Sequence, residues 1–297
     1  MTDIISEGIE RLKKEKYAFA LGVSGARLTT FGSGGPISIL VRPENAERLL
    51  ALEEILSGIP RFVIGSGSNV LLSSAGLAGA LIKLDAFCLE RVSGRVLEVG
   101  AGVTMPRLSS IAERAGLSGV EFASGIPGSV GGAIKTNASA FGQAISDGLL
   151  FVTALVGNKV ERLRPEELGF SYHRAALPKN SIVLSAAFSL AEGDKSKIGE
   201  RIETFREKRL ATQPQGRSAG SVFRKCGEVP AAIYIEKTGL KGLKIGGARL
   251  SEKHCNFIVN EGGASSEDFF EIAETVRKKA LEEQGVSLEY EVEKIGW

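Results

Sequence analysis

The chain has 297 residues, which suits two or three domains rather than one small domain. Lys and Arg together number 37 and Asp and Glu 35, and this even balance, with a net charge of +2, argues against a general nucleic-acid binder. Charged residues begin at the N-terminus and no apolar run approaches a membrane span, so we expect neither a signal peptide nor a membrane anchor.

Cysteine and histidine are scarce. The three cysteines, Cys88, Cys226 and Cys255, lack the spacing of a metal site, and only two histidines accompany them. We therefore expect reduced thiols, no metal centre and a cytoplasmic location.

Helix and strand patterns alternate in the N-terminal part of the chain. Ile5, Ile9 and Leu12 recur at helical spacing, the apolar run 37–41 predicts a strand, and the stretch 44–56 predicts a second amphipathic helix. Residues 79–84 and 95–99 are further strand candidates. In the helix that follows, Thr104 suits the N-cap and Gly116 lies just past the expected end.

A glycine-rich turn separates two predicted strands in the stretch 61–72, RFVIGSGSNVLL. The turn can present successive backbone N–H groups to phosphate oxygens. A hairpin turn built of small residues is the alternative.

Five glycines crowd the stretch 124–142, SGIPGSVGGAIKTNASAFG. Glycine lets a backbone approach a ligand closely, and Ser129, Thr136, Asn137 and Ser139 interleave polar side chains. This composition suits a segment that wraps a pyrophosphate, although it matches neither of the two common phosphate-binding glycine motifs. An ordinary glycine-rich loop is the alternative.

Later elements follow in order. Residues 151–156 and 181–190 predict strands, and the alternation in the second suggests one buried face. A helix around 198–209 leads into a predicted linker, 211–220, with a domain boundary near 205–215. The third part shows a helix at 230–238, a strand at 256–260, a helix from the capping box 265–268 to Gly285, and a strictly alternating strand at 286–292.

The chain resembles the UDP-N-acetylenolpyruvoylglucosamine reductase family from about Thr29 to Ile295. One glycine-rich loop would be weak evidence, whereas motifs in the same order along the whole chain are strong. These motifs are TTFGSGGP (29–36), GSGSNVLL (65–72), GIPGSVGGAIKTNASAFG (125–142), FSYHR (170–174), SAGSVF (218–223), EKTGLKGLKIGGARLSEKHCNFIVN (236–260) and LEYEV (288–292). The short link between FSYHR and SAGSVF is similar to the shorter form of the family, without the extra substrate-covering loop.

The resemblance implies an α+β flavoenzyme in three parts. Residues 1–85 and 86–205 would form a two-part FAD-binding region of the vanillyl-alcohol-oxidase/PCMH type. Residues 206–297 would form a substrate-binding α+β domain, and the sequence leaves open where its last strand packs.

The implied reaction belongs to peptidoglycan precursor synthesis. NADPH reduces bound FAD, and the flavin then reduces UDP-N-acetylglucosamine enolpyruvate to UDP-N-acetylmuramate. A vinyl ether accepts a hydride only if the developing negative charge is stabilised and then quenched by a proton. The implied partners are two small-molecule substrates, and we expect a monomer that binds neither nucleic acid nor a membrane.

Two residues match the catalytic positions of the family, and the third position departs from its pattern. The resemblance makes Ser221 the proton donor and gives Glu291 the task of polarising the substrate carboxylate. The family pairs this carboxylate with an arginine directly after a tyrosine, whereas here His173 precedes Arg174. Either residue could fill the role. Arginine is always charged and holds a carboxylate by two bonds, and we favour Arg174 because its long side chain can reach from the next position. A turn serine, a solvated glutamate and a surface loop are the structural alternatives.

The resemblance also assigns binding residues. Those for FAD are Gly65, Ser66, Gly67, Ser68, Asn69, Gly125, Ile126, Pro127, Gly128, Ser129, Gly132, Ala133 and Asn137. Those for the substrate are Arg174, Arg224, Lys225, His254 and Asn256. The pair Arg224 and Lys225 could meet the substrate diphosphate or could be solvated. The chain departs from the family at Tyr290, where proline is usual.

Two other functions stay open at this point. An FAD-dependent sugar or lactone oxidoreductase often attaches its flavin through His or Cys in the N-terminal half, but Cys88 and His173 lie outside the glycine-rich loops. A non-enzymatic flavin-binding regulator would explain the displaced arginine. The presence of both Ser221 and Glu291 argues against it.

Overall fold

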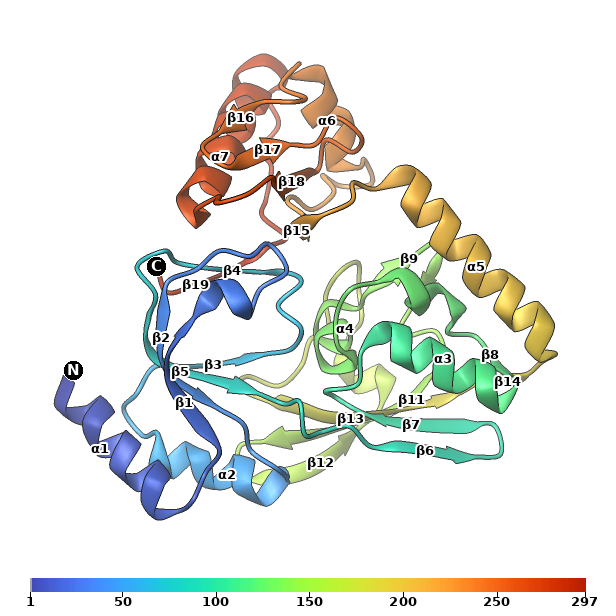
Figure 1. The fold of residues 1–297 in the computed structure, drawn as a ribbon. Coiled ribbons are helices and arrows are strands. Elements are labelled where there is room, and N and C mark those ends of the chain that lie inside the picture. Colours follow the sequence, from blue (N-terminus) through green and yellow to red (C-terminus); the bar gives the residue numbers. More distant parts are fainter. Residues whose placement is uncertain (1) are drawn as a thin grey trace. The chain divides into compact units, whose positions relative to one another are not determined.

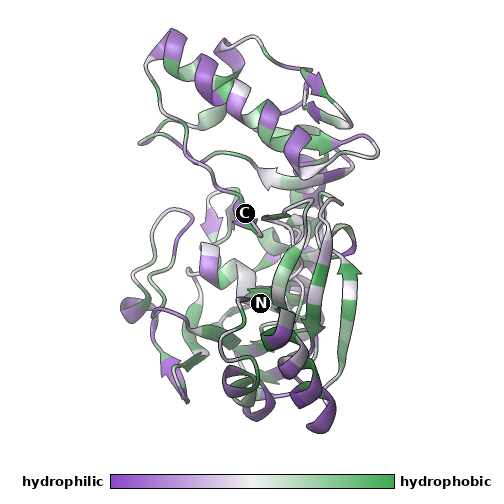
Figure 2. Ribbon diagram, turned by 90° about the vertical axis from the view of Figure 1, so that its left-hand side faces the viewer, coloured by the Kyte–Doolittle hydropathy of each residue, from purple (hydrophilic) through white to green (hydrophobic). Residues whose placement is uncertain are grey.

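The computed structural model describes residues 2–297 (Figure 1). The chain divides into two compact units, each formed by separate stretches of sequence. Unit 1 comprises the described residues before Ala20 together with Leu40–Ser66 and Leu81–Arg209, and unit 2 comprises Ala20–Ile39, Gly67–Ala80 and Leu210–Trp297. Figure 2 shows hydrophobic residues concentrated along the strands and polar residues on the helices. None of the helices in the described part is long and apolar enough to cross a bilayer.

A five-stranded antiparallel sheet forms the centre of unit 1. Its strand order is β12-β11-β13-β7-β6. The bounds are β12 (Lys159–Leu163), β11 (Leu149–Val156), β13 (Ile182–Ser189), β7 (Val96–Gly100) and β6 (Glu90–Ser93). Val183 and Ala187 are buried as fully as Ile182 and Phe188, so the expectation of one buried face for β13 is wrong. A central strand that is covered on both faces shows continuous rather than alternating burial.

The predicted helices of unit 1 are confirmed, and local capping signals set their ends. Helix α3 (Met105–Ala115) begins where the Thr104 side chain accepts the N–H of Arg107, and it ends at Gly116 with φ +68°. The other elements of unit 1 are α1 (Thr2–Lys14), α2 (Ala46–Ile55), β8 (Leu117–Ser118), the 3₁₀ helix η2 (Glu121–Gly125), α4 (Val130–Thr136), β9 (Ser139–Ala140), β10 (Gln143–Ala144), the 3₁₀ helix η3 (Pro165–Leu168) and β14 (Ala191–Glu192).

Helix α5 (Lys195–Thr212) is the last element of unit 1, and the buried carboxylate of Glu121 connects it to the rest of that unit. Glu121 accepts hydrogen bonds from the Ser118 hydroxyl at 2.6 Å and the Gly119 N–H at 2.8 Å, and it pairs with Arg201 on α5 at 3.4 Å. Because α5 continues to Thr212 and the next strand begins at Arg217, the predicted linker 211–220 is wrong in its bounds.

A four-stranded sheet has the order β1-β2-β5-β3. Its strands are β1 (Phe19–Ser24), β2 (Pro36–Val41), β5 (Leu77–Lys83) and β3 (Arg61–Ile64), and the 3₁₀ helix η1 (Gly25–Arg27) follows β1. The strand predicted after the 65–69 turn is present as β4 (Val70–Leu72), but β4 pairs with β19 (Glu293–Ile295) in parallel and not with β3. The hairpin interpretation of residues 61–72 is therefore wrong.

Unit 2 packs two helices on an antiparallel sheet with the order β15-β18-β17-β16. The strands are β15 (Arg217–Ser221), β16 (Lys244–Ile245), β17 (Ala248–Leu250) and β18 (Phe257–Asn260), and the helices are α6 (Ala231–Lys237) and α7 (Ser266–Gln284). The core of unit 2 includes Phe31 and Phe269, whose rings meet edge to face with centroids 5.1 Å apart.

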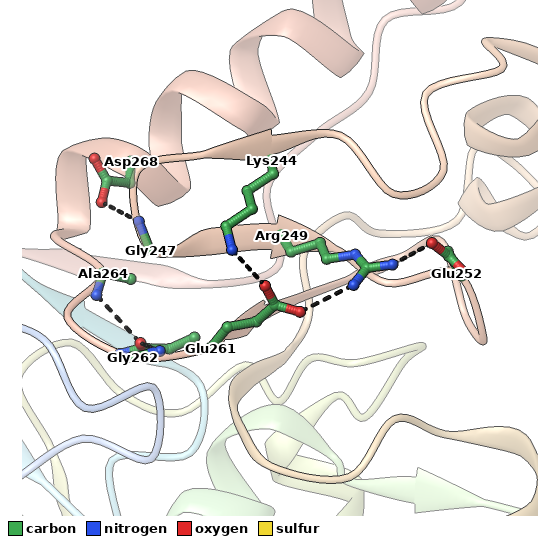
Figure 3. Close-up of polar contacts among 9 residues, drawn as sticks. Lys244, Gly247, Arg249, Glu252, Glu261, Gly262, Ala264 and Asp268 are labelled. Carbon is green, nitrogen blue, oxygen red and sulfur yellow. Dashed lines mark hydrogen bonds and ion pairs between the residues drawn. The ribbon is translucent and has the colours of Figure 1, made fainter.

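The turn between β16 and β17 explains the glycine pair of the KIGGA motif. Gly246 has φ +53°, and a Cβ on Gly247 would overlap the carbonyl oxygen of Gly262. Asp268, the third residue of α7, accepts the N–H of Gly247 at 3.2 Å (Figure 3). It also accepts the N–H of Ser265 at 2.9 Å. The positive φ favours glycine at position 246, and close backbone packing requires it at position 247.

An ion-pair network lies beside this turn. The carboxylate of Glu261 contacts Lys244 at 2.9 Å and Arg249 at 3.1 Å, and Arg249 also pairs with Glu252 (Figure 3). The hydrogen bonds from Lys244 and Arg249 lower the pKa of Glu261. The network joins the ends of β16, β17 and β18 at the surface.

The strand predicted at 286–292 is wrong. Leu288 and Val292 are buried while Ser287 and Glu289 are exposed, so the alternation of faces is present. The segment nevertheless forms only one isolated bridge among the described residues, between Tyr290 and Phe223, and regular pairing starts at Glu293. Alternating burial needs an extended backbone but does not need a hydrogen-bonded neighbour along its length.

We expect Asp268→Asn to destabilise the protein in a pH-dependent way. Hydrogen bonds from Ser265 and Gly247 lower the pKa of Asp268, so its stabilisation is present above its unfolded pKa of about 4 and is lost as the pH falls through the lower folded pKa. At pH 7 the variant should lose about 1 kcal/mol of unfolding free energy. Thermal unfolding from pH 7 to pH 2.5, with exposed Asp3→Asn as the control, should show the gap closing in acid. A gap that does not change with pH would contradict this.

Candidate active site

Ser221 lies at a bulge in unit 2. The register of β15 against β18 shifts between Ser218 and Ser221, and Gly220 adopts φ +77° just before Ser221. A bulge re-aims the side chain that follows it. Among the described residues, none forms a hydrogen bond with the half-buried Ser221 hydroxyl.

Main-chain pairing brings Glu291 beside the segment that follows Ser221. The N–H of Glu291 donates to the carbonyl of Val222 at 2.9 Å, and the N–H of Arg224 donates to the carbonyl of Glu289 at 2.9 Å. The Arg224 guanidinium also donates to the carbonyl of Tyr290 at 3.3 Å. The structure therefore unites the predicted proton donor and glutamate, which are distant in sequence.

Asn69 of the 65–69 turn contacts the same segment. Its side-chain amide donates to the carbonyl of Glu291 at 3.1 Å, and its own carbonyl accepts the N–H of Glu293 at 3.0 Å. Thr30 connects the turn to β15, since its hydroxyl donates to the carbonyl of Ser218 at 2.6 Å while its N–H donates to that of Gly67 at 3.0 Å. Unit 2 thus places residues 67–69 of the predicted cofactor turn next to the predicted catalytic segment.

Asn256 uses both polar atoms of its side chain on Phe223. Its Oδ1 accepts the N–H of Phe223 at 2.9 Å, and its Nδ2 donates to the carbonyl of Phe223 at 2.8 Å. Its main-chain carbonyl also accepts the N–H of Val222 at 2.9 Å. This geometry makes the buried Asn256 a support for the main chain that follows Ser221.

His254 lies two residues before Asn256 and is half-buried. Its Nδ1 accepts the N–H of Asn256 at 3.3 Å, and its ring lies 4.9 Å from that of Phe257. Burial, aided by the charge of Lys241, lowers the pKa of His254. The imidazole is therefore neutral at neutral pH, and its Nε2–H is the donor that a substrate could use.

The two cations of the predicted pair, Arg224 and Lys225, contact different groups. Arg224 lies against the carbonyl of Tyr290, as described above, while Lys225 pairs with the exposed Glu228 at 2.8 Å. Both side chains are half-buried.

In unit 1, the two glycine-rich stretches meet at Gly65 and Ser129. A Cβ on Gly65 would overlap the Ser129 hydroxyl, which caps α4 by accepting the N–H of Gly132 at 3.4 Å. Of the other residues assigned to FAD in the 125–137 stretch, Gly125, Ile126, Pro127, Gly128 and Gly132 are at least partly accessible, whereas Ala133 and Asn137 are buried.

These stretches have unused polar groups that suit an anionic, polar cofactor. Outside helices and strands, no described main-chain carbonyl accepts the N–H groups of Ser66, Gly67, Ser68, Gly128 or Ser129. Successive free N–H groups of this kind bind phosphate oxygens. Asn137 adopts φ +44° and donates to the carbonyl of Ser171 at 3.0 Å, while its buried Oδ1 has no partner among the described residues. The residues present therefore fit a dinucleotide such as FAD.

Arg174 lies in a tight turn of unit 1. Ser171 and Arg174 exchange two main-chain hydrogen bonds, at 2.9 and 3.2 Å, around Tyr172 and His173, and His173 adopts φ +50°. The N–H of Ala175 donates to the carbonyl of Lys135, so the turn is anchored at the end of α4. The choice between Arg174 and His173 for the carboxylate role stays a prediction.

Sequence reasoning missed Arg209. Its stem packs over Gly125, with its Cδ 2.9 Å from where a Cβ on that glycine would lie. Burial lowers the pKa of Arg209, and no carboxylate in the described part of the chain pairs with it. A partly buried cation without a counter-charge favours an anionic ligand. Its position in a helix rich in arginine and lysine gave no signal to distinguish it.

The described residues hold no group of three or more His, Cys, Asp or Glu side chains able to bind a metal ion.

Comparisons with known proteins agree with this geometry. Residues 37–158 match the model of an FAD binding domain, and residues 213–295 match that of the C-terminal domain of UDP-N-acetylenolpyruvoylglucosamine reductase. The chain is 40% identical to the UDP-N-acetylenolpyruvoylglucosamine reductase of Paramagnetospirillum magneticum over 91% of its length and 90% of the relative. The Bacillus subtilis reductase is 39% identical, with 97% and 98% covered.

The chain belongs to the UDP-N-acetylenolpyruvoylglucosamine reductase family. Its fold is similar to the crystal structure of the Thermus caldophilus reductase, with a TM-score of 0.82, 35% identity, and 94% of this chain and 99% of that chain covered. The predicted family and the α+β flavoenzyme fold are thereby confirmed. As a member of this reductase family with an FAD-binding domain, the chain is an oxidoreductase.

We expect Asn256→Ala to destabilise this reductase by about 2–4 kcal/mol, because two buried main-chain groups of Phe223 lose their partners. Chemical denaturation should measure the loss. Asn158→Ala, in the exposed turn between β11 and β12, is the control and should change the unfolding free energy by less than about 0.5 kcal/mol. Equal stability of the two variants would show that the contacts to Phe223 are dispensable.

Proposed function

We propose that this reductase uses FAD and NADPH to convert UDP-N-acetylglucosamine enolpyruvate to UDP-N-acetylmuramate in peptidoglycan precursor synthesis. The observation that carries this proposal is the main-chain pairing of residues 222–224 with 289–291, which places the Ser221 and Glu291 segments side by side in a member of this family. The two relatives described above are UDP-N-acetylenolpyruvoylglucosamine reductases, and their activity suggests the substrate.

In this proposal the two glycine-rich stretches hold FAD. The 65–69 turn and the loop before α4 would direct their free N–H groups at the diphosphate, and the Asn137 Oδ1 would meet a donor of the cofactor. Bound FAD supplies the hydride that reduces the substrate alkene. We keep the three-part division of residues 1–85, 86–205 and 206–297 as the proposed organisation of cofactor and substrate binding.

The chain's own residues then control charge and protons. Arg174 would hold the substrate carboxylate by two hydrogen bonds, and Glu291 would polarise it. The Ser221 hydroxyl would give its proton to the substrate carbon next to the carboxylate. The neutral His254 would donate a hydrogen bond from Nε2, and Arg224 and Lys225 would face the diphosphate of the substrate. A monomeric, cytoplasmic enzyme stays a prediction from the sequence.

Ser221→Ala should separate the two half-reactions. Without the proton donor, we expect flavin reduction by NADPH to stay within about twofold of wild type, while product formation falls by about 10²–10⁴-fold. Anaerobic flavin absorbance during successive additions of NADPH and the enolpyruvate measures both steps. Ser218→Ala on the same strand is the matched control. Full product formation by Ser221→Ala would overturn the assigned role.

Arg209→Gln should weaken flavin binding. Loss of a charged hydrogen bond to the cofactor diphosphate should raise the FAD dissociation constant by about 10- to 100-fold. Arg206→Gln removes the same charge from an exposed position on α5, where Arg206 pairs with Glu203. Titration of the two apoproteins with FAD compares them, and equal affinities would exclude Arg209 from the cofactor site.

A further inference from the structure

Tyr290 lies directly before the predicted catalytic Glu291 and is held by side-chain contacts of its own. Its hydroxyl donates to the Glu274 carboxylate on α7 at 2.7 Å. Its ring lies 5.2 Å from that of Phe223 and 5.7 Å from that of Phe270. Tyr290 therefore connects α7 to the segment that follows Ser221.

The main chain around Tyr290 transmits its position to Glu291. Two hydrogen bonds flank the Tyr290–Phe223 bridge, one from the Glu291 N–H and one from the Arg224 N–H. Among the described residues, this bridge does not extend into a longer ladder of strand pairs, since regular pairing begins only at Glu293. The side chains of Asn69 and Arg224 also donate to the carbonyls of Glu291 and Tyr290. To these contacts the side chain of Tyr290 adds a hydrogen bond to α7 and ring packing on Phe223.

The charges around the phenol keep it a hydrogen-bond donor. Burial, reinforced by Glu274, raises the pKa of Tyr290 far above its ordinary value. Burial opposes ionisation of Glu274, but the Tyr290 hydroxyl and Arg277 together lower its pKa. Arg277 contacts Glu274 at 2.8 Å, and the ammonium of Lys294 lies 4.5 Å from the centre of the Tyr290 ring. The contact is thus a charge-assisted bond from a neutral phenol to a carboxylate.

We propose that Tyr290 is a positioning residue, which fixes Glu291 beside the Ser221 segment through its hydroxyl bond to Glu274 and its packing on Phe223. The inference rests on the proposed function, because it assigns Glu291 to the product-forming half-reaction. A residue of the general core would affect stability and both half-reactions alike. A positioning residue affects the half-reaction that uses Glu291.

The test compares Tyr290→Phe, Glu274→Leu and Glu274→Gln with wild-type holoenzyme. Tyr290→Phe keeps the ring and loses the hydroxyl, and Glu274→Gln keeps an acceptor. Tyr17→Phe is the matched control, because it removes a phenol that donates to the carbonyl of Arg48 at 2.7 Å in unit 1. Stopped-flow absorbance measures flavin reduction by NADPH and, separately, reoxidation of reduced enzyme by the enolpyruvate.

We expect Tyr290→Phe and Glu274→Leu to slow reoxidation by about 10- to 100-fold, as small misplacements of catalytic groups do, with flavin reduction within about twofold of wild type. The double variant should be no slower than either single variant, and Glu274→Gln should recover part of the rate. Hydrogen exchange gives a readout independent of activity. The exchange rate of the Glu291 amide should rise in Tyr290→Phe and stay at the wild-type value in Tyr17→Phe.

Each other outcome overturns the inference in a distinct way. Wild-type reoxidation rates in Tyr290→Phe would remove the positioning role and leave the proposed function intact. Equal slowing of both half-reactions would make Tyr290 a residue of the general core. Failure of the enolpyruvate to reoxidise wild-type enzyme would refute the proposed function, and the inference with it.

Discussion

The antiparallel pairing of residues 222–224 with residues 289–291 is the contact on which the candidate site depends. It joins two segments that are far apart in sequence through two main-chain hydrogen bonds of 2.9 Å. It also supplies the Glu291 carbonyl that Asn69 binds, so the cofactor turn is anchored to the same place. The pairing thus holds the segments of the predicted proton donor and glutamate together in unit 2, and Thr30 adds a second link from Gly67 to β15.

The glycines of the glycine-rich motifs are of two kinds: some lie too close to neighbouring atoms for a Cβ, and others have space for one. A Cβ would overlap a neighbouring oxygen at Gly65, Gly67 and Gly247, whereas at Gly132 it would reach only ordinary contact distance. Glycine at the first two positions lets the 65–69 turn lie against Ser129 and Leu28, and the N–H groups of the turn remain available. The same residue type therefore builds a hairpin in the KIGGA motif and, in the 65–69 turn, a loop with accessible N–H groups.

Local signals in the sequence predicted the helices well, because a capped helix needs only neighbouring residues. The capping box of Ser265 and Asp268 and the αL glycines at the ends of α3 and α7 are examples. Non-local features escaped prediction. The alternation of residues 286–292 could not distinguish a paired strand from an extended segment, and the parallel partner of β4 lies at the far end of the chain. Family resemblance supplied Ser221 and Glu291 and assigned Asn69 and Asn256 to ligands, but it did not predict the hydrogen bonds of these two side chains to the main chain of Glu291 and Phe223.

The bulge in β15 explains why a side chain must provide hydrogen-bond partners for the main chain that follows it. Once the register shifts before Ser221, the ladder with β18 no longer provides partners for the main chain of Phe223. Buried main-chain groups without partners would cost about 1–3 kcal/mol each. Asn256 provides both missing partners from a single side chain, while its own carbonyl holds Val222. Next to this local break in the sheet, the Ser221 hydroxyl has no hydrogen-bond partner among the residues that the structure describes, and the side chain of Asn256 holds the neighbouring backbone in place.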